Sequence, residues 1–163
     1  MQSAQLEQIQ EFLKLRRIAM AGVSRDPKDF SRMLFAELLQ RGYAVTPVNP
    51  NADFIGSARC YPRLSSIETT PDGVLVMTPR AQTAQVCDDA IAIGVPRLWM
   101  YRAIGHGSVD PAAAEKCRRA GIDVIEGYCP FLFLEDVAWY HRAHGAVLAV
   151  LGKYPPREDA RVE

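Results

Sequence analysis

The sequence has little of what marks several common classes of protein. Lysine and arginine number 19 and are balanced by 19 acidic residues, so the basic excess typical of a nucleic-acid-binding protein is missing. The longest apolar run, residues 145–152, is far shorter than the roughly 20 residues that span a bilayer. The four cysteines show no Cys-x-x-Cys spacing, which would indicate a zinc or redox site. We therefore expect no nucleic-acid partner, no membrane span and no metal site.

The amino-terminal segment also lacks the features of a secretory signal. Residues 1–14 are polar with a helical pattern, and they contain no basic start followed by an apolar stretch. Hydrophobic residues make up 48% and charged residues 23% of the 163 residues, which is ordinary for a soluble globular protein. These features predict one cytoplasmic domain with a single sizeable core.

Short apolar runs alternate with helical patterns along the chain. The runs lack the period-two alternation of half-buried strands, which indicates strands covered by helices on both faces. The pattern predicts a single-domain α/β fold, a Rossmann-like doubly wound parallel sheet of about five strands. The expected strands are residues 17–21, 44–48, 73–77, 97–101 and 122–126. The expected helices are residues 3–15, 30–41, 82–93 and 111–120.

Two further expectations concern how these elements end and how they are ordered. Asp110 and Pro111 form an N-cap and first-turn proline pair, and Gly42 stands where a helix ends. Numbered along the chain, the strands are expected in the order 3-2-1-4-5, with a ligand crevice at the carboxyl ends of strands one and four. The irregular stretch 49–66 has room for a short strand or a helical turn.

The first turn of the sheet departs from the dinucleotide fingerprint. That fingerprint needs Gly-x-Gly-x-x-Gly after strand one and an acidic residue at the end of strand two. Here Gly22 is followed by no second or third glycine at that spacing, and strand two ends in Asn49-Pro50. Asp53 lies too far along the chain to replace the acidic residue. The sequence therefore disfavours a nicotinamide site.

The same turn nevertheless suits a phosphate. A glycine lets the backbone turn tightly, and the helix that follows offers free N–H groups at its positive end. The loop adds hydroxyl and cationic side chains that favour a pyrophosphate or a 3′-phosphate: Ser24, Arg25, Lys28, Ser31 and Arg32. Two plainer interpretations stay open, a simple turn glycine and a solvated polar loop.

Several segments together resemble a known family. They are Ile18–Ser24, the Pro-Val-Asn-Pro of Gly42–Pro50, Ile55-Gly56 and Tyr61–Leu64, and the similarity continues to Cys129-Pro130. Over about residues 15–130 the chain resembles the CoA-binding domain family, small bacterial proteins similar to the amino-terminal domain of the succinyl-CoA synthetase α subunit.

The resemblance implies a Rossmann-like domain that holds coenzyme A across the carboxyl ends of its strands. By position, Gly22 and Ser24 would lie at the phosphates, Asn49 and Pro50 near the adenosine, and Lys28 near an anionic group. The turn after strand three would also line the site. The full set of candidate ligand-binding residues is Gly22, Val23, Ser24, Arg25, Lys28, Ser31, Asn49, Pro50, Thr78, Pro79, Arg80 and Tyr101.

The resemblance also bears on catalysis. Ligases of this kind need a second domain with a phosphorylated histidine, and we expect none within these 163 residues. No catalytic residues are assigned, and the expected function is non-catalytic binding of coenzyme A or an acyl-CoA, in a regulatory or carrier role. Two alternatives stay open: an NAD(P)-dependent oxidoreductase with an altered Rossmann site, and a CoA-ligase subunit that acts with a partner.

The carboxyl-terminal extension 131–163 carries much apolar surface beyond the expected core of 15–130. Two interpretations stay open for it. It packs back onto the core, or it forms an interface between copies of a homo-oligomer.

Overall fold

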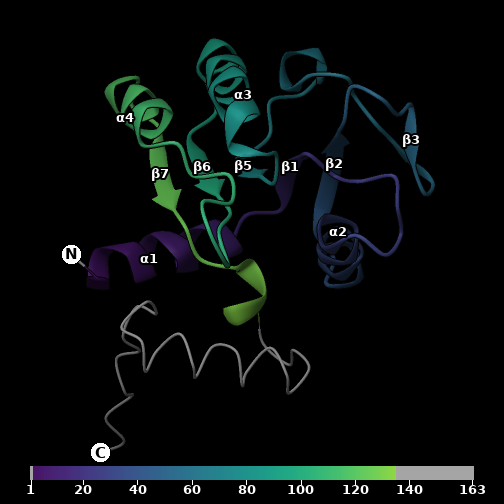
Figure 1. Ribbon diagram of the computed structural model, residues 1–163, viewed down its shortest axis with the longest axis horizontal. Coiled ribbons are helices and arrows are strands. Elements are labelled where there is room, and N and C mark those ends of the chain that lie inside the picture. Colours follow the sequence, from purple (N-terminus) through teal and green to yellow (C-terminus); the bar gives the residue numbers. More distant parts are fainter. Residues whose placement is uncertain (1, 135–163) are drawn as a thin grey trace, which may run out of the picture.

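Helices cover both faces of a five-stranded parallel sheet in the computed structural model, which describes residues 2–134 (Figure 1). The sheet consists of β1 (Arg17–Ala21), β2 (Ala44–Val48), β5 (Gly73–Val76), β6 (Arg97–Met100) and β7 (Asp123–Glu126). The helices are α1 (Gln2–Leu13), α2 (Phe30–Gln40), α3 (Arg80–Ile93) and α4 (Pro111–Arg119). The predicted α/β doubly wound fold is confirmed, and the predicted elements agree with the observed ones to within two residues at each end.

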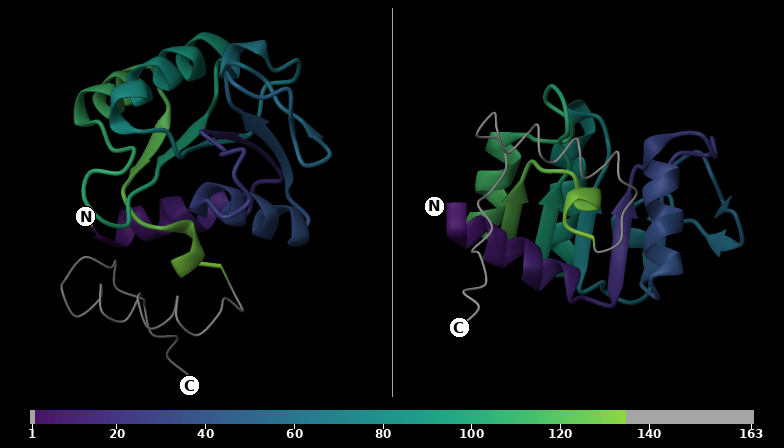
Figure 2. Two further views of the ribbon diagram at one scale, coloured as in Figure 1. Left: turned by 45° about the vertical axis from the view of Figure 1, so that its right-hand side comes forward. Right: turned by 90° about the horizontal axis from the view of Figure 1, so that it is seen from below.

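The sheet separates two apolar layers, because alternate residues of each strand point to opposite faces. In β1, Ile18 and Met20 pack against α1 and α2, whereas Ala19 and Ala21 pack against α3 and α4. Figure 1 shows the two helix pairs on opposite sides of the sheet, and the strands can be followed in the right-hand view of Figure 2. Every residue of β5 is buried, as expected for a central strand of such a sheet.

The predicted strand order is wrong. The observed order is β2-β1-β5-β6-β7, so the third main strand lies beside the first and the second lies at the edge. The strand order follows from packing across the whole sheet, and Pro47 in β2 fits an edge position, because proline has no backbone N–H to donate within an interior strand. The chain reverses its direction of winding between β1 and β5, and the predicted crevice between strands one and four does not exist, because β5 separates β1 from β6.

The predicted ends of two helices are confirmed. The carboxylate of Asp110 accepts hydrogen bonds from the backbone N–H groups of Ala112 and Ala113, at 3.0 and 3.2 Å, with Pro111 in the first turn. Gly42 follows α2 with a φ of +86°, the left-handed conformation that glycine adopts without strain.

The irregular stretch after β2 contains the hairpin of β3 (Phe54–Ile55) and β4 (Ala58–Arg59), followed by the 3-10 turn η1 (Leu64–Ser66). This segment carries the chain from the edge strand β2 over to β5. It thereby places η1 against α3.

The described chain ends with the 3-10 turn η2 (Pro130–Leu132) and two further residues. Phe131, Leu132 and Leu134 are buried and belong to the apolar layer that contains α1 and α2. The part of the predicted extension beyond Leu134 lies outside the described residues. Among residues 2–134, no helix has both the length and the apolar composition needed to cross a bilayer.

Candidate functional site

A pocket of about 570 Å³ lies at the carboxyl ends of β1, β2 and β5, where the direction of winding reverses. This is the position at which open α/β sheets bind ligands. The strand ends contribute Ala21, Gly22, Val48, Asn49, Pro50, Asn51, Thr78 and Pro79. The η1 segment and α3 contribute Pro62, Arg63, Leu64, Ala81, Gln82, Gln85, Val86 and Asp89.

Gly22 brings the turn after β1 against the end of β5. Its φ is +89°, and a Cβ atom built there would lie 2.7 Å from the backbone nitrogen of Thr78 and 2.9 Å from the carbonyl carbon of Met77. Both the conformation and the contact therefore require glycine. The turn thus places its backbone beside Thr78 at the floor of the pocket.

Thr78 is buried, and its hydroxyl oxygen has no hydrogen-bond partner among residues 2–134. Its backbone carbonyl accepts a 2.6 Å hydrogen bond from the hydroxyl of Ser108. The carbonyl of Ser108 in turn accepts a 2.7 Å hydrogen bond from the hydroxyl of Thr83 in α3. This buried network fixes the backbone of the turn after β5, whereas the Thr78 hydroxyl itself is buried with no hydrogen-bond partner among residues 2–134.

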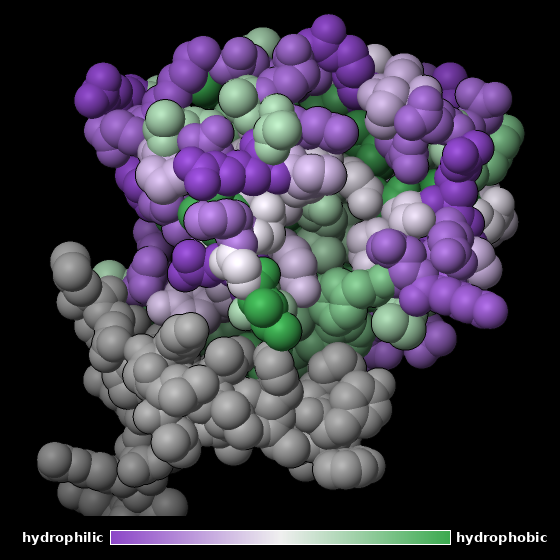
Figure 3. Space-filling model, in the orientation of Figure 1, coloured by the Kyte–Doolittle hydropathy of each residue, from purple (hydrophilic) through white to green (hydrophobic). Residues whose placement is uncertain are grey.

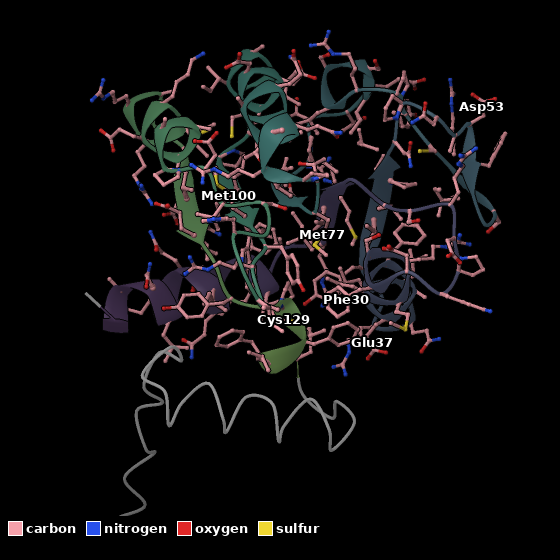
Figure 4. All side chains as sticks on the ribbon, viewed as in Figure 1. Phe30, Glu37, Asp53, Met77, Met100 and Cys129 are labelled. Carbon is pink, nitrogen blue, oxygen red and sulfur yellow. The ribbon has the colours of Figure 1, made fainter. Side chains whose placement is uncertain are left out.

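Asn49 fixes the turn after β2. Its side-chain N–H₂ donates to the carbonyl of Val23 at 2.8 Å, and its side-chain oxygen accepts from the backbone N–H of Asn51. The amide thus ties the end of β2 to the turn after β1. Figure 4 shows Asp53, the nearest acidic residue along the chain, beside β3 at the outer edge of the molecule.

The loop between β1 and α2 satisfies many of its own polar groups. The Ser31 hydroxyl accepts from the N–H of Ser24 at 3.0 Å and donates to the carboxylate of Asp29 at 2.5 Å. The same carboxylate caps α2 by accepting from the N–H of Ser31. A negative charge therefore already occupies the amino-terminal end of α2, the place where sequence reasoning expects a phosphate.

Tyr101 and Cys129 belong to an aromatic cluster next to α2. The Tyr101 ring stacks on Phe30 with centroids 5.3 Å apart, and Phe30 also meets Phe131 at 5.4 Å. Burial raises the pKa of Tyr101 to about 12 and that of Cys129 to about 11, so both groups stay protonated near neutral pH. Figure 4 shows Phe30 and Cys129 in this cluster. Figure 3 shows residues of intermediate and high hydropathy, coloured white and green, in the recessed centre of the same face.

Arg63 and Asp89 form an ion pair in the wall of the pocket. The guanidinium donates from Nη2 to Oδ1 at 2.5 Å and from Nε to Oδ2 at 3.2 Å. Burial is the largest single influence and acts to raise the pKa of Asp89. The hydrogen bonds and the charge of Arg63, together with hydrogen bonds from Ser65 and Gln85, outweigh burial and hold that pKa below its usual range. Asp89 is therefore a carboxylate at neutral pH.

The structure brings some of the predicted site residues together and leaves others apart. Five of them line the pocket: Gly22, Asn49, Pro50, Thr78 and Pro79. The pocket lining does not include Val23, Ser24, Arg25, Lys28, Ser31, Arg80 or Tyr101.

Sequence reasoning missed the wall formed by η1 and α3. A signal was present in α3, because Gln82, Gln85, Val86 and Asp89 recur at the three- and four-residue spacing of one helix face. Arg63 stands in the Tyr-Pro-Arg-Leu motif, but nothing local shows that it meets a residue 26 positions along the chain.

The chain is similar to known proteins in sequence and in fold. Among curated proteins, the chain is similar to the uncharacterized protein YneT of Bacillus subtilis, with 28% identity over 130 residues that cover 79% of this chain and 93% of that protein. Among solved structures, it is similar to a hypothetical protein from Pyrococcus horikoshii OT3, with a TM-score of 0.70, 26% identity and coverage of 76% of this chain and 85% of that one.

A larger enzyme contains a region of the same fold. The dinucleotide-forming acetyl-coenzyme A synthetase 1 of Ca. Korarchaeum cryptofilum matches with a TM-score of 0.60 and 24% identity over 70% of this chain, which corresponds to 26% of the enzyme. At this identity the match shows the shared fold. A sequence model of the CoA binding domain matches residues 16–135, which include every strand of the sheet and every residue that lines the pocket. The chain therefore belongs to the CoA-binding domain family.

Proposed function

We propose that this protein binds coenzyme A or an acyl-CoA in the pocket at the ends of β1, β2 and β5. The observation that carries the proposal is the turn pair at its floor, where only glycine fits at position 22 and the Thr78 hydroxyl lacks a partner among the described residues. A buried hydroxyl without a partner is unfavourable, and a ligand that accepts its hydrogen bond would relieve this.

The pocket suits the nucleotide end of coenzyme A. Its volume of about 570 Å³ lies in the range of small-molecule sites, roughly 300–1,000 Å³. Apolar side chains from η1 and α3, such as Leu64 and Val86, provide walls for a flat purine, and the amides of Asn51, Gln82 and Gln85 offer donors and acceptors for its edges. Gly22 and Thr78 would hold the phosphates, and Asn49 and Pro50 would lie near the adenosine.

A binding role without catalysis agrees with the chemistry of the described groups. Asp89 is the only acidic side chain within residues 2–134 that lines this pocket, and it is held as a carboxylate by Arg63. The thiol of Cys129, whose pKa is raised to about 11, is a poor nucleophile. These features support a carrier or regulatory role for the bound CoA.

The test is calorimetric titration of the purified protein with CoA, acetyl-CoA, NAD⁺ and NADP⁺ in parallel. We expect binding of CoA and acetyl-CoA and no binding of the nicotinamide nucleotides, since Asn49, which follows β2, stands where the dinucleotide fingerprint has an acidic residue. Binding of NAD⁺ or NADP⁺ alone would overturn the proposal and favour an oxidoreductase.

Thr78→Val sharpens the same test. The variant should bind CoA about tenfold more weakly, which corresponds to the loss of one hydrogen bond of about 1.4 kcal/mol. Its stability without ligand should not fall, because the hydroxyl has no partner to lose among the described residues. Unchanged affinity for CoA would contradict the assigned role of Thr78.

A further inference from the structure

The carboxylate of Asp89 holds the guanidinium of Arg63 in place. Each oxygen of Asp89 accepts from two donors: Oδ1 from Arg63 and Gln85, and Oδ2 from Arg63 and Ser65. The Asp89 side chain is 7% exposed, whereas that of Arg63 is 55% exposed. The carboxylate is thus saturated inside the wall, and the guanidinium is presented at the pocket.

The guanidinium keeps unused donors. Its hydrogen bonds to Asp89 come from Nε and Nη2, so both N–H groups of Nη1 remain. Among residues 2–134, the Arg63 side chain makes no other hydrogen bond or ion pair. A planar group fixed on one edge by a carboxylate presents its opposite edge in a defined direction, which is the arrangement in which arginine binds phosphate oxygens.

The sequence predicts phosphate contacts in the loop between β1 and α2, but the polar groups of this loop bond to one another or lie outside the pocket lining. The amino-terminal end of α2 carries the Asp29 carboxylate, and neither Arg25 nor Lys28 lines the pocket. Among residues 2–134, Arg63 is the only lysine or arginine that lines this pocket. A phosphorylated ligand in the pocket therefore has one cation within its walls.

We propose that Arg63 binds a phosphate group of the nucleotide and that Asp89 is the positioning residue that orients its guanidinium. This inference rests on the proposed binding of CoA and names the side chain, Arg63, that favours a phosphorylated ligand over an unphosphorylated one. The phosphate is either the 3′-phosphate of the ribose or the pyrophosphate, and the experiment below distinguishes these two sources.

The experiment measures the affinities of wild type and Arg63→Gln for CoA, dephospho-CoA and adenosine by calorimetry. We expect the substitution to weaken CoA binding about 10- to 100-fold, the range for loss of a hydrogen bond between charged groups. If the contact is to the 3′-phosphate, dephospho-CoA binds both proteins equally. If the contact is to the pyrophosphate, both CoA and dephospho-CoA bind the variant more weakly by the same factor.

Arg59→Gln is the matched control. Arg59 lies in β4, four positions before Arg63, and its guanidinium pairs with Glu68 at 3.6 Å outside the pocket lining. The substitution removes the same charge from the same segment between β2 and β5. Its affinity for CoA should stay within about twofold of wild type, since an exposed charge that does not touch the ligand is screened by salt.

A double-mutant cycle tests the role of Asp89. Asp89→Asn alone should weaken CoA binding, but in the Arg63→Gln background it should have no further effect, because Asp89 acts through Arg63. A purely structural role would give additive losses. The double variant also removes the buried charge that Arg63→Gln leaves unpaired, so it supplies a folded protein if the single variant unfolds.

Three results would overturn the inference. One is an Arg63→Gln variant that binds CoA as tightly as wild type does. Another is an equal loss of adenosine affinity, which would show contact with the base or sugar. The third is a wild-type protein that binds neither CoA nor dephospho-CoA, and this result alone would also refute the proposed function.

Discussion

Gly22 and Gly42 have almost the same backbone torsion, with φ of +89° and +86°, but they differ in their surroundings. A Cβ at Gly22 would meet the backbone of Thr78 at 2.7 Å, whereas a Cβ at Gly42 would meet no atom within 4 Å. Comparing the two glycines therefore separates the effect of a left-handed backbone conformation from the effect of close contact with a neighbouring backbone. Only the second effect belongs to the site.

The first prediction follows from this contrast. Gly42→Ala should lower the free energy of unfolding by about 1 kcal/mol through backbone strain alone. Gly22→Ala should lower it by about 3 kcal/mol or more, because the backbone of β5 must also shift. Urea denaturation followed by circular dichroism would measure both values, and equal losses would show that the approach to Thr78 is not tight.

The second prediction concerns the pH dependence of the Arg63–Asp89 pair. The pKa of Asp89 is lowered in the folded protein, so the pair stabilises the fold above the ordinary aspartate pKa of about 3.9 and this stabilisation is lost as the pH falls through the lower, folded pKa. Wild type should be more stable than Asp89→Asn by about 1–2 kcal/mol at pH 7, since Arg63 is half exposed and the pair is partly screened. Unfolding measured from pH 7 to pH 2 should show this difference begin to shrink below about pH 4 and continue to fall at lower pH, and a constant difference would contradict the assigned ionisation.

At the scale of elements, the pocket depends on contacts that join separate helices and loops. The turn after β5 is fixed by Ser108, which lies just before α4, and Ser108 is itself fixed by Thr83 of α3. Both hydrogen bonds are buried, so each is shielded from solvent. The floor of the pocket is therefore as rigid as the packing of α3 and α4.

A third prediction tests this connection. Thr83→Val removes the donor to the Ser108 carbonyl and should lower stability by about 1–2 kcal/mol, because that buried carbonyl loses its 2.7 Å partner. Thr78→Val is the matched comparison, since both substitutions replace a buried hydroxyl by a methyl group. Within the described residues, the Thr83 hydroxyl has a hydrogen-bond partner and the Thr78 hydroxyl has none. Similar stabilities for the two variants would contradict the network.

At the scale of the whole molecule, the apolar core extends beyond the region expected from the sequence. Ile9 and Phe12 of α1 are buried against the sheet, and the Phe12 ring meets Trp99 edge-on with centroids 5.4 Å apart. The amino-terminal helix is thus part of the core rather than an appendage of it.

The fourth prediction follows from this packing. Phe12→Ala should destabilise the protein by about 3–5 kcal/mol, the usual result of truncating a buried aromatic side chain. Leu39→Ala on α2 is the control, because Leu39 is 41% exposed and should lose about 1 kcal/mol or less. If thermal unfolding gave equal shifts for the two variants, α1 would contribute little to the core.

The sequence by itself determined the local features of this protein. Apolar runs located every strand of the main sheet, Asp110 and Gly42 marked helix ends, and the glycine at position 22 marked the turn at which the pocket lies. These features could be predicted because each depends on residues that are close together in the chain. The Pro-Val-Asn-Pro segment likewise indicated the family that the match over residues 16–135 confirms.

Only the tertiary structure decided which of these features meet. The strand order follows from packing across the whole sheet, and the one local signal for it, Pro47 in an edge strand, is weak in isolation. The contact between Arg63 and Asp89 joins residues 26 positions apart, and that between Thr78 and Ser108 joins residues 30 apart. Such contacts depend on the order of the strands and the placement of α3, because chain segments come together only when the layers on both faces of the sheet pack at once.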